Sequence, residues 1–188
     1  MRSILGQTTK GEEQRQRIIS AALHLFAERG YAGTSVQRIA GEVGISKQLV
    51  LYHFQTKDGL KDGVLTSLMA RWMPIFEGFV RLARGEDADI DQVLEHLIAM
   101  YEEHPASARF WLRELLDNSS QIRASLEEIT YPRMKSLVDE AQVDDADQVL
   151  AALELVALSM LTVFAIYGET DLYESRVVLL KKALIALF

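Results

Sequence analysis

The sequence predicts an all-α protein of about nine helices, and three observations support this prediction. Apolar residues recur at helical spacing along the 188 residues. No segment alternates apolar and polar residues between turn pairs, as a half-exposed strand would. Residues that cap helices, such as Ser35 and Gly44, stand where the periodic segments start or stop.

The first helix is expected from about Glu12 to Arg29, after a flexible tail over residues 1–11. Its apolar face consists of Ile18, Ala22, Leu25 and Phe26. Gly30 follows the last turn, where the chain needs a left-handed cap.

Two short helices are expected next, joined by a tight turn. Ser35 is placed to cap the first, whose inner face is Val36, Ile39, Ala40 and Val43. Gly44 ends that helix, Ile45 is a buried turn residue, and Ser46 caps a helix from Lys47 to about Phe54. Two short helices around a glycine-containing turn form the helix-turn-helix arrangement, whose second helix enters the major groove of DNA.

The second short helix has two different faces. Val50 and Phe54, four residues apart, are predicted to face the core. The opposite face is cationic, amide-bearing and aromatic, and it consists of Lys47, Gln48, Leu51 and Tyr52. Lysine can donate to guanine, glutamine can pair with adenine, and the leucine and tyrosine can touch thymine methyl groups.

Further residues are predicted to border the groove and contact phosphates: Ser35, Gln37, Ser46, His53 and Lys57. Free N–H groups at two helix starts, one of them after Thr56, would assist. Residues 1–61 carry nine basic and five acidic side chains, or +4, and the remainder carries −11. A cationic end on an anionic body is expected where one end meets a polyanion, although chance clustering explains the charge alone equally well.

Four motifs follow one another in the N-terminal third: Phe26-Ala-Glu-Arg-Gly-Tyr31, Thr34-Ser-Val-Gln-Arg-Ile-Ala40, Gly44-Ile-Ser46 and Tyr52-His-Phe-Gln-Thr-Lys57. Together they resemble the DNA-binding domain of tetracycline-repressor (TetR) family regulators. Their order and spacing match the family over roughly a quarter to a third of the chain. The resemblance implies a DNA-binding domain over residues 1–60 and a helical effector-binding and dimerisation domain over 61–188.

The chain departs from the family pattern at one position and from a common helix cap at another. Leu51 stands where family members often carry tyrosine, so that contact is lost or taken over by Tyr52. Gly59 stands where a glutamate would complete a capping box after Thr56.

The remaining chain is also helical by its periodicity. A long helix from Lys57 is expected to kink near Arg71 because of Pro74. Further helices are expected over about 90–103, 106–118, 119–141, 144–168 and 172–187, with Pro132 bending the third of these.

The last two helices carry apolar stripes that are too extensive for one small monomer to cover. The residues are Leu150, Leu153, Ala157, Leu161, Phe164, Val177, Leu180 and Leu184. A homodimer built as a four-helix bundle would cover them. The resemblance implies the same assembly, and the alternative is that each residue belongs to the core of the monomer.

A second set of aromatic and methionine residues is predicted to line a pocket for a mainly apolar small molecule. Its members are Trp72, Phe76, Met100, Tyr101, Phe110, Trp111, Met134, Met160 and Tyr167. Polar contacts are expected from Tyr101, His104, Arg109 and Arg113. Taken singly, each residue is better explained as plain core. Taken as a group, and with the resemblance, the residues are explained equally well by a pocket and by a core.

Catalytic, metal-binding and membrane-spanning patterns are not found in the sequence. The chain has no cysteine, and none of its four histidines has a glutamate three residues before it. The sequence also contains no glycine-rich phosphate loop and no Gly-x-Ser-x-Gly nucleophile elbow. The apolar segment 149–167 has acidic flanks instead of the basic ones that orient a spanning helix. We therefore expect a cytoplasmic protein without cofactor or metal.

These features together predict a ligand-responsive transcriptional regulator. We expect a repressor that binds a palindromic double-stranded DNA operator as a homodimer and is released by an apolar small molecule. The alternatives are an all-helical enzyme and an adaptor that does not bind DNA.

Overall fold

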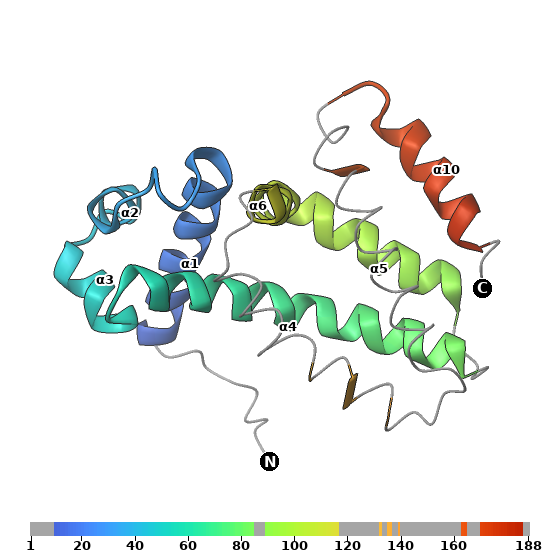
Figure 1. The fold of residues 1–188 in the computed structure, drawn as a ribbon, viewed down its shortest axis with the longest axis horizontal. Helices are drawn as coiled ribbons and strands as arrows, with labels where there is room; N and C mark the ends of the chain where they lie inside the picture. Colours follow the sequence, from blue (N-terminus) through green and yellow to red (C-terminus); the bar gives the residue numbers. More distant parts are fainter. Residues whose placement is uncertain are drawn as a thin grey trace, which may run out of the picture. The chain divides into compact units, whose positions relative to one another are not determined.

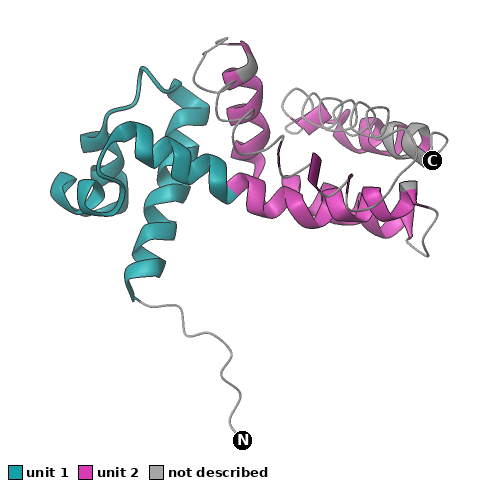
Figure 2. Cartoon of the chain, turned by 60° about the horizontal axis from the view of Figure 1, so that its bottom comes forward, with its two compact units in different colours: residues 1–67 teal, residues 68–188 magenta. Residues whose placement is uncertain are grey.

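The computed structural model describes residues 10–84, 89–116, 132, 135–136, 139, 163–164 and 170–185. Every regular element in these residues is an α-helix (Figure 1). The predicted all-α fold is therefore confirmed. The chain divides into two compact units, residues 1–67 and 68–188 (Figure 2).

Unit 1 contains α1 (Lys10–Arg29), α2 (Val36–Val43), α3 (Lys47–Phe54) and the start of α4 (Lys57–Ala83). Its core is formed by fully or nearly fully buried side chains from all four helices: Ile18, Ala22, Phe26, Ile39, Ala40, Val50, Phe54, Leu60 and Val64. These residues repeat at helical spacing, so burial of one face on each helix holds the unit together.

Unit 2 contains the rest of α4, α5 (Ile90–Glu103), α6 (Pro105–Leu116) and α10 (Tyr173–Ile185). Helices α4 and α5 approach closely at Gly78, where a Cβ atom would lie 2.7 Å from Val93 Cγ2. The Tyr173 hydroxyl donates a 2.9 Å hydrogen bond to Glu102 Oε1 and so joins α10 to α5.

Most predicted helix bounds agree with the structure to within two residues. Helix α1 begins at Lys10 instead of Glu12, α5 has the predicted bounds, and α4 continues through Pro74 without ending. The helices predicted over 119–141 and 144–168 lie largely outside the described residues. The units divide within α4, after Ser67, whereas the sequence places the domain boundary after residue 60.

Candidate DNA-binding surface

The turn between α2 and α3 is built by three residues that the sequence marks for it. Ser35 caps α2, and its side chain accepts a hydrogen bond from the Arg38 N–H at 3.2 Å. Gly44 adopts φ +74°, and the Ile45 N–H donates to the Ala40 carbonyl at 2.9 Å, which closes the end of α2.

Ser46 starts α3 in the same manner as Ser35 starts α2, since its side chain accepts from the Leu49 N–H at 3.2 Å. Both serines have extended backbone conformations, as expected of residues that cap a helix. Side-chain caps thus define where both short helices begin.

Helix α3 has one buried and one exposed face, in the orientation that the sequence predicts. Val50 is 1% exposed and Phe54 is 6% exposed, whereas Tyr52 is 80% exposed. Lys47 and Gln48 are exposed as well. Burial of the two apolar anchors therefore fixes the rotation of α3 and turns a lysine, an amide and a phenol outward.

The turn from α3 to α4 places Gln55 in an unusual backbone conformation, with φ +63° and ψ −53°. The Thr56 N–H donates to the Phe54 carbonyl at 2.6 Å, which makes the turn a γ-turn centred on Gln55. The backbone of any residue other than glycine is strained in this region of φ. The end of the exposed helix is thus held in a strained turn.

Close packing at this turn explains the glycine that interrupts the capping box. A Cβ atom on Gly59 would lie 2.4 Å from the Phe54 carbonyl oxygen. Glutamate cannot occupy the position without moving α3 away from α4. The cap itself is present, because the Gly59 N–H donates to Thr56 Oγ1 at 2.9 Å.

We predict that Gln55→Gly stabilises the protein by about 1 kcal/mol. Relief of the strained φ contributes of order 1–3 kcal/mol, and the greater freedom of glycine in the unfolded chain removes about 0.5–1 kcal/mol. Urea unfolding measures the difference. The matched control is Gln48→Gly inside α3, which should lower stability; a loss of stability in both variants would contradict the γ-turn.

Lys57 lies against Tyr31, which comes from the segment between α1 and α2. Its Nζ donates to the Tyr31 carbonyl at 2.5 Å and stands 4.0 Å from the centre of the Tyr31 ring. Burial lowers the pKa of Lys57; the neighbouring Asp58 acts in the opposite direction, and Lys61 lowers the pKa further. Lys57 therefore joins the start of α4 to the segment between α1 and α2, a role that the sequence does not reveal.

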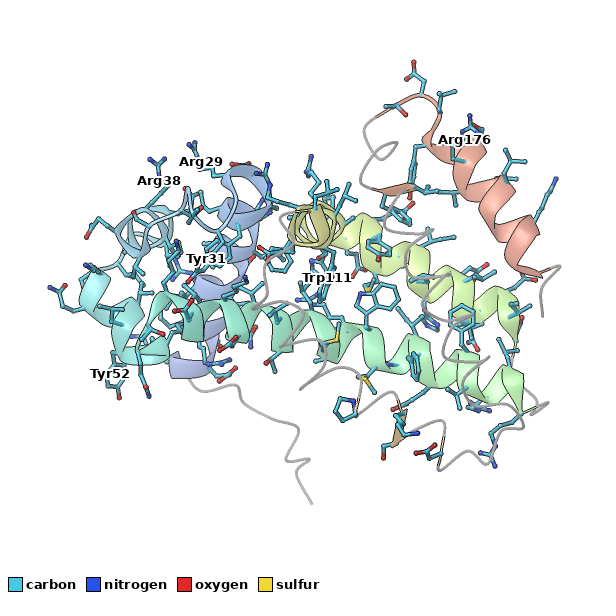
Figure 3. All side chains as sticks on the ribbon, in the orientation of Figure 1. Arg29, Tyr31, Arg38, Tyr52, Trp111 and Arg176 are labelled. Carbon is cyan, nitrogen blue, oxygen red and sulfur yellow. The ribbon has the colours of Figure 1, made fainter. Side chains whose placement is uncertain are left out.

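The other residues predicted to contact DNA differ in exposure. Ser35, Gln37 and Ser46 are exposed, whereas Leu51 and His53 are half-buried, and Ile45, predicted as buried, is half-buried as well. Arg38, which we did not predict as a contact, is also exposed. In the view of Figure 3 it projects from the side of unit 1 opposite to Tyr52, so exposure alone does not place it on the same surface.

The predicted ligand-binding residues fall into three groups in unit 2. Phe76, Tyr101, Phe110 and Trp111 are buried, and Trp72 packs edge-on against Tyr101 with ring centroids 5.8 Å apart. Met100 instead lines an open groove of about 750 Å³ between α4 and α5. Met134, Met160 and Tyr167 lie outside the described residues.

The four residues predicted as polar ligand contacts differ in burial. Arg109 is exposed, Arg113 is half-buried, and only Tyr101 is fully buried. His104 contacts Arg71 through its Nε2 atom. Burial, followed by the Arg71 charge, lowers the pKa of His104.

Part of the predicted dimer surface can be located. Phe164 is 8% exposed and stacks on Tyr101 at 4.5 Å, which places it in the interior of unit 2. Val177 is half-buried, and on the same helix Val178 and Leu179 are 51% and 55% exposed. Four members of the predicted surface lie outside the described residues: Leu150, Leu153, Ala157 and Leu161. The side chains of two more, Leu180 and Leu184, are not described.

The described part of the chain shows neither a metal site nor a membrane span. These residues contain no group of three or more His, Asp or Glu side chains placed to hold a metal ion. Among the same residues, no helix has the length and apolar character needed to cross a bilayer. The apolar segment 149–167 lies almost entirely outside them.

Residues 18–63 match the family described as "Bacterial regulatory proteins, tetR family". The HTH-type transcriptional regulator RutR of Escherichia coli strain K12 is 28% identical over 130 residues, which cover 68% of this chain. The same alignment spans 58% of RutR. The HTH-type transcriptional repressor Rv3405c of Mycobacterium tuberculosis is 47% identical over 60 residues, or 32% of each chain.

A solved transcriptional regulator from Aquifex aeolicus has the same fold. The two structures superpose with a TM-score of 0.68 at 19% identity, covering 93% of this chain and 99% of the other. The structural similarity thus extends over both units. At 19% identity it shows a shared fold and nothing beyond the fold.

The N-terminal unit, with a capped and outward-facing α3 after a glycine turn, is a helix-turn-helix DNA-binding domain. The match over residues 18–63 assigns this unit to the DNA-binding domains of the tetR family of bacterial regulatory proteins. The matched relatives are named as a transcriptional regulator and a transcriptional repressor.

Proposed function

We propose that the protein is a transcriptional repressor that binds a palindromic operator as a homodimer and leaves it when a small molecule binds unit 2. The observation that carries the proposal is the exposed face of α3. Lys47, Gln48 and Tyr52 are exposed there, while Val50 and Phe54 are buried behind them. Such a face can reach base edges in the major groove.

The charge of the N-terminal region supports an interaction with DNA. Residues 1–61 carry a net charge of +4, although the whole chain carries −7. Local positive charge attracts the phosphate backbone, and its effect weakens as salt is added. Ser35, Gln37, Ser46, His53 and Lys57 are proposed to contact phosphates at the edge of the groove.

A second copy of the chain is the proposed partner of α10. Val178 and Leu179 expose apolar surface there, and dimerisation would cover it. A two-fold dimer places two recognition helices in successive major grooves, about 34–36 Å apart on the DNA. The operator is therefore proposed to be a palindrome.

Helix α4 is the proposed link between ligand and DNA. It begins in unit 1 directly after the strained turn at Gln55 and ends in unit 2. A ligand that displaces α4 in one subunit would change the spacing of the two recognition helices. A preference of about 1.4 kcal/mol for the altered spacing lowers operator affinity tenfold.

The test is recovery of genomic fragments that the purified full-length protein retains, followed by affinity measurements at several salt concentrations. We expect a shared palindromic sequence and an affinity that falls steeply with salt. An adaptor or an enzyme would show no salt-dependent retention of duplex DNA. We further propose that the protein acts in the cytoplasm, where the operator is located.

Lys57→Ala is predicted to weaken binding to all DNA sequences and to reduce the slope of log affinity against log salt by about 1 unit. The melting temperature should also fall, because the variant loses the contacts with Tyr31. Filter binding at several salt concentrations measures the slope. Arg29→Ala removes an exposed cation elsewhere in unit 1 and serves as the control; an unchanged slope for Lys57→Ala would leave that lysine with a role in folding alone.

A further inference from the structure

Three polar side chains of α5 and α6 are buried without a hydrogen-bond partner. The atoms are the Tyr101 hydroxyl, Ser107 Oγ and the indole Nε1 of Trp111. The three residues are 0%, 2% and 5% exposed, respectively. An unpaired buried polar group destabilises a protein, and native structures contain few of them. Their concentration on two neighbouring helices indicates a site with a function.

Helix α6 places two of these groups on one face. Ser107 and Trp111 are four residues apart, and Glu114 follows at the next helical step on the same side. Glu114 is only 3% exposed, so a carboxyl group belongs to this buried face. Figure 3 draws the Trp111 side chain below α6, among other side chains of unit 2.

Aromatic rings form the surroundings of Tyr101. Phe164 stacks on the Tyr101 ring at 4.5 Å with an interplanar angle of 18°, and Trp72 meets it edge-on at 80°. Phe110 lies 5.9 Å from Trp111 in a similar edge-on contact. A flat apolar body suits such surroundings, because aromatic rings pack well in stacked and edge-on geometries.

The unpaired atoms specify hydrogen-bond acceptors on the ligand. An indole N–H donates and cannot accept. Burial raises the pKa of Tyr101 well above its ordinary value, so the hydroxyl keeps its proton and can donate. A ligand oxygen that accepts from either group would satisfy an atom that the protein leaves without a partner.

The charges of unit 2 argue against a carboxylate ligand. The described side chains of unit 2 include no buried lysine or arginine that could neutralise an anion. An uncharged oxygen, such as a carbonyl, avoids this difficulty.

We propose that the effector is an uncharged molecule with a flat apolar body and a carbonyl-type oxygen, which accepts a hydrogen bond from Trp111 Nε1 or from the Tyr101 hydroxyl. The inference rests on the proposed function of unit 2 as the effector-binding part. It adds the chemical class of the ligand and the atoms that recognise it.

Three probes of nearly the same shape test the proposal on the full-length protein. Acetophenone carries a carbonyl oxygen, α-methylstyrene replaces that oxygen by a methylene group, and benzoate carries a charge. Binding is measured by calorimetry with the wild-type protein, Trp111→Phe and Tyr101→Phe. Tyr31→Phe is the matched control, since it removes a phenol hydroxyl of unit 1 that donates to Asp58.

We expect the ratio of the acetophenone and α-methylstyrene dissociation constants to change about tenfold in Trp111→Phe or Tyr101→Phe, as the loss of one hydrogen bond predicts. The ratio should stay unchanged in Tyr31→Phe, and benzoate should bind most weakly. The ligand-free Tyr101→Phe protein should melt no lower than the wild type, because it loses an unpaired hydroxyl and no hydrogen bond.

Three outcomes would overturn the proposal: an equal ratio in all variants, tighter binding of benzoate, or binding of none of the probes. Duplex binding without probes is measured on the same preparations. Normal salt-dependent DNA binding together with any of these outcomes would reject the ligand class and leave the proposed regulator intact. Absence of DNA binding would reject the regulator, whatever the probes do.

Discussion

Replacing Lys47 and Gln48 together by alanine is expected to remove most of the protein's preference for its operator. Both side chains are exposed on α3, on the side away from the buried Val50 and Phe54. A side chain that reads a base contributes about 1–3 kcal/mol of discrimination. The operator affinity relative to a scrambled duplex should therefore fall about 100-fold or more.

Fluorescence anisotropy with the two duplexes at one salt concentration measures the ratio. The melting temperature should hardly change, because exposed substitutions outside caps and cores usually alter stability by less than about 0.5 kcal/mol. The control is Arg29→Ala, which removes a cation on the side of unit 1 opposite to Tyr52 in Figure 3 and should leave the ratio intact. Equal losses on both duplexes would mean that Lys47 and Gln48 contact phosphates and read no bases.

Helix bounds could be predicted wherever a side chain terminates the helix by its own chemistry. Ser35, Gly44 and Ser46 stop or start helices through local hydrogen bonds or through a left-handed φ, and all three act as the sequence indicates. The same applies to the amphipathic faces, which burial of Val50 and Phe54 confirms.

The strained turn at Gln55 could not be predicted, because its cause is tertiary. Glutamine carries no local preference for positive φ. The conformation accompanies the close approach of α3 and α4, which Gly59 and Gly63 both permit. A Cβ atom on Gly63 would lie 2.9 Å from Phe54 Cε1. In the sequence, Gly59 stands where a glutamate would complete a capping box. In the structure, a larger residue at this position would clash with the Phe54 carbonyl oxygen, so close packing requires the glycine.

The sequence does not distinguish core from interface among the apolar residues of the C-terminal half, because helical periodicity shows which residues share a face and not what covers that face. The sequence pattern groups Phe164 with the dimer residues, yet Phe164 stacks on Tyr101 inside unit 2. In α10 four apolar residues follow one another, from Val177 to Leu180. Four consecutive apolar residues lie on all sides of a helix, so the sequence does not show which of them are covered. The structure shows that Val177 is half-buried and that Val178 and Leu179 are exposed.

Leu179→Glu is expected to convert the proposed dimer into monomers. Leu179 is 55% exposed in the single chain, so a carboxylate there stays hydrated until a second copy covers it. Enclosing an unpaired charge in an apolar contact costs several kcal/mol, and about 2.7 kcal/mol already raises the dissociation constant of a dimer about 100-fold. Sedimentation velocity at micromolar concentration measures the change.

Operator affinity should fall with the dimer, because the two recognition helices then bind their half-sites separately. Linked half-sites bind more tightly than single ones by a factor of about 10²–10⁴, so a loss of at least about 100-fold is expected on the palindrome and almost none on an isolated half-site. Leu116→Glu introduces the same charge at a side chain that is 75% exposed on α6 and serves as the control. If Leu179→Glu stays dimeric and Leu116→Glu does not, the subunit contact lies at the end of α6 and not on α10.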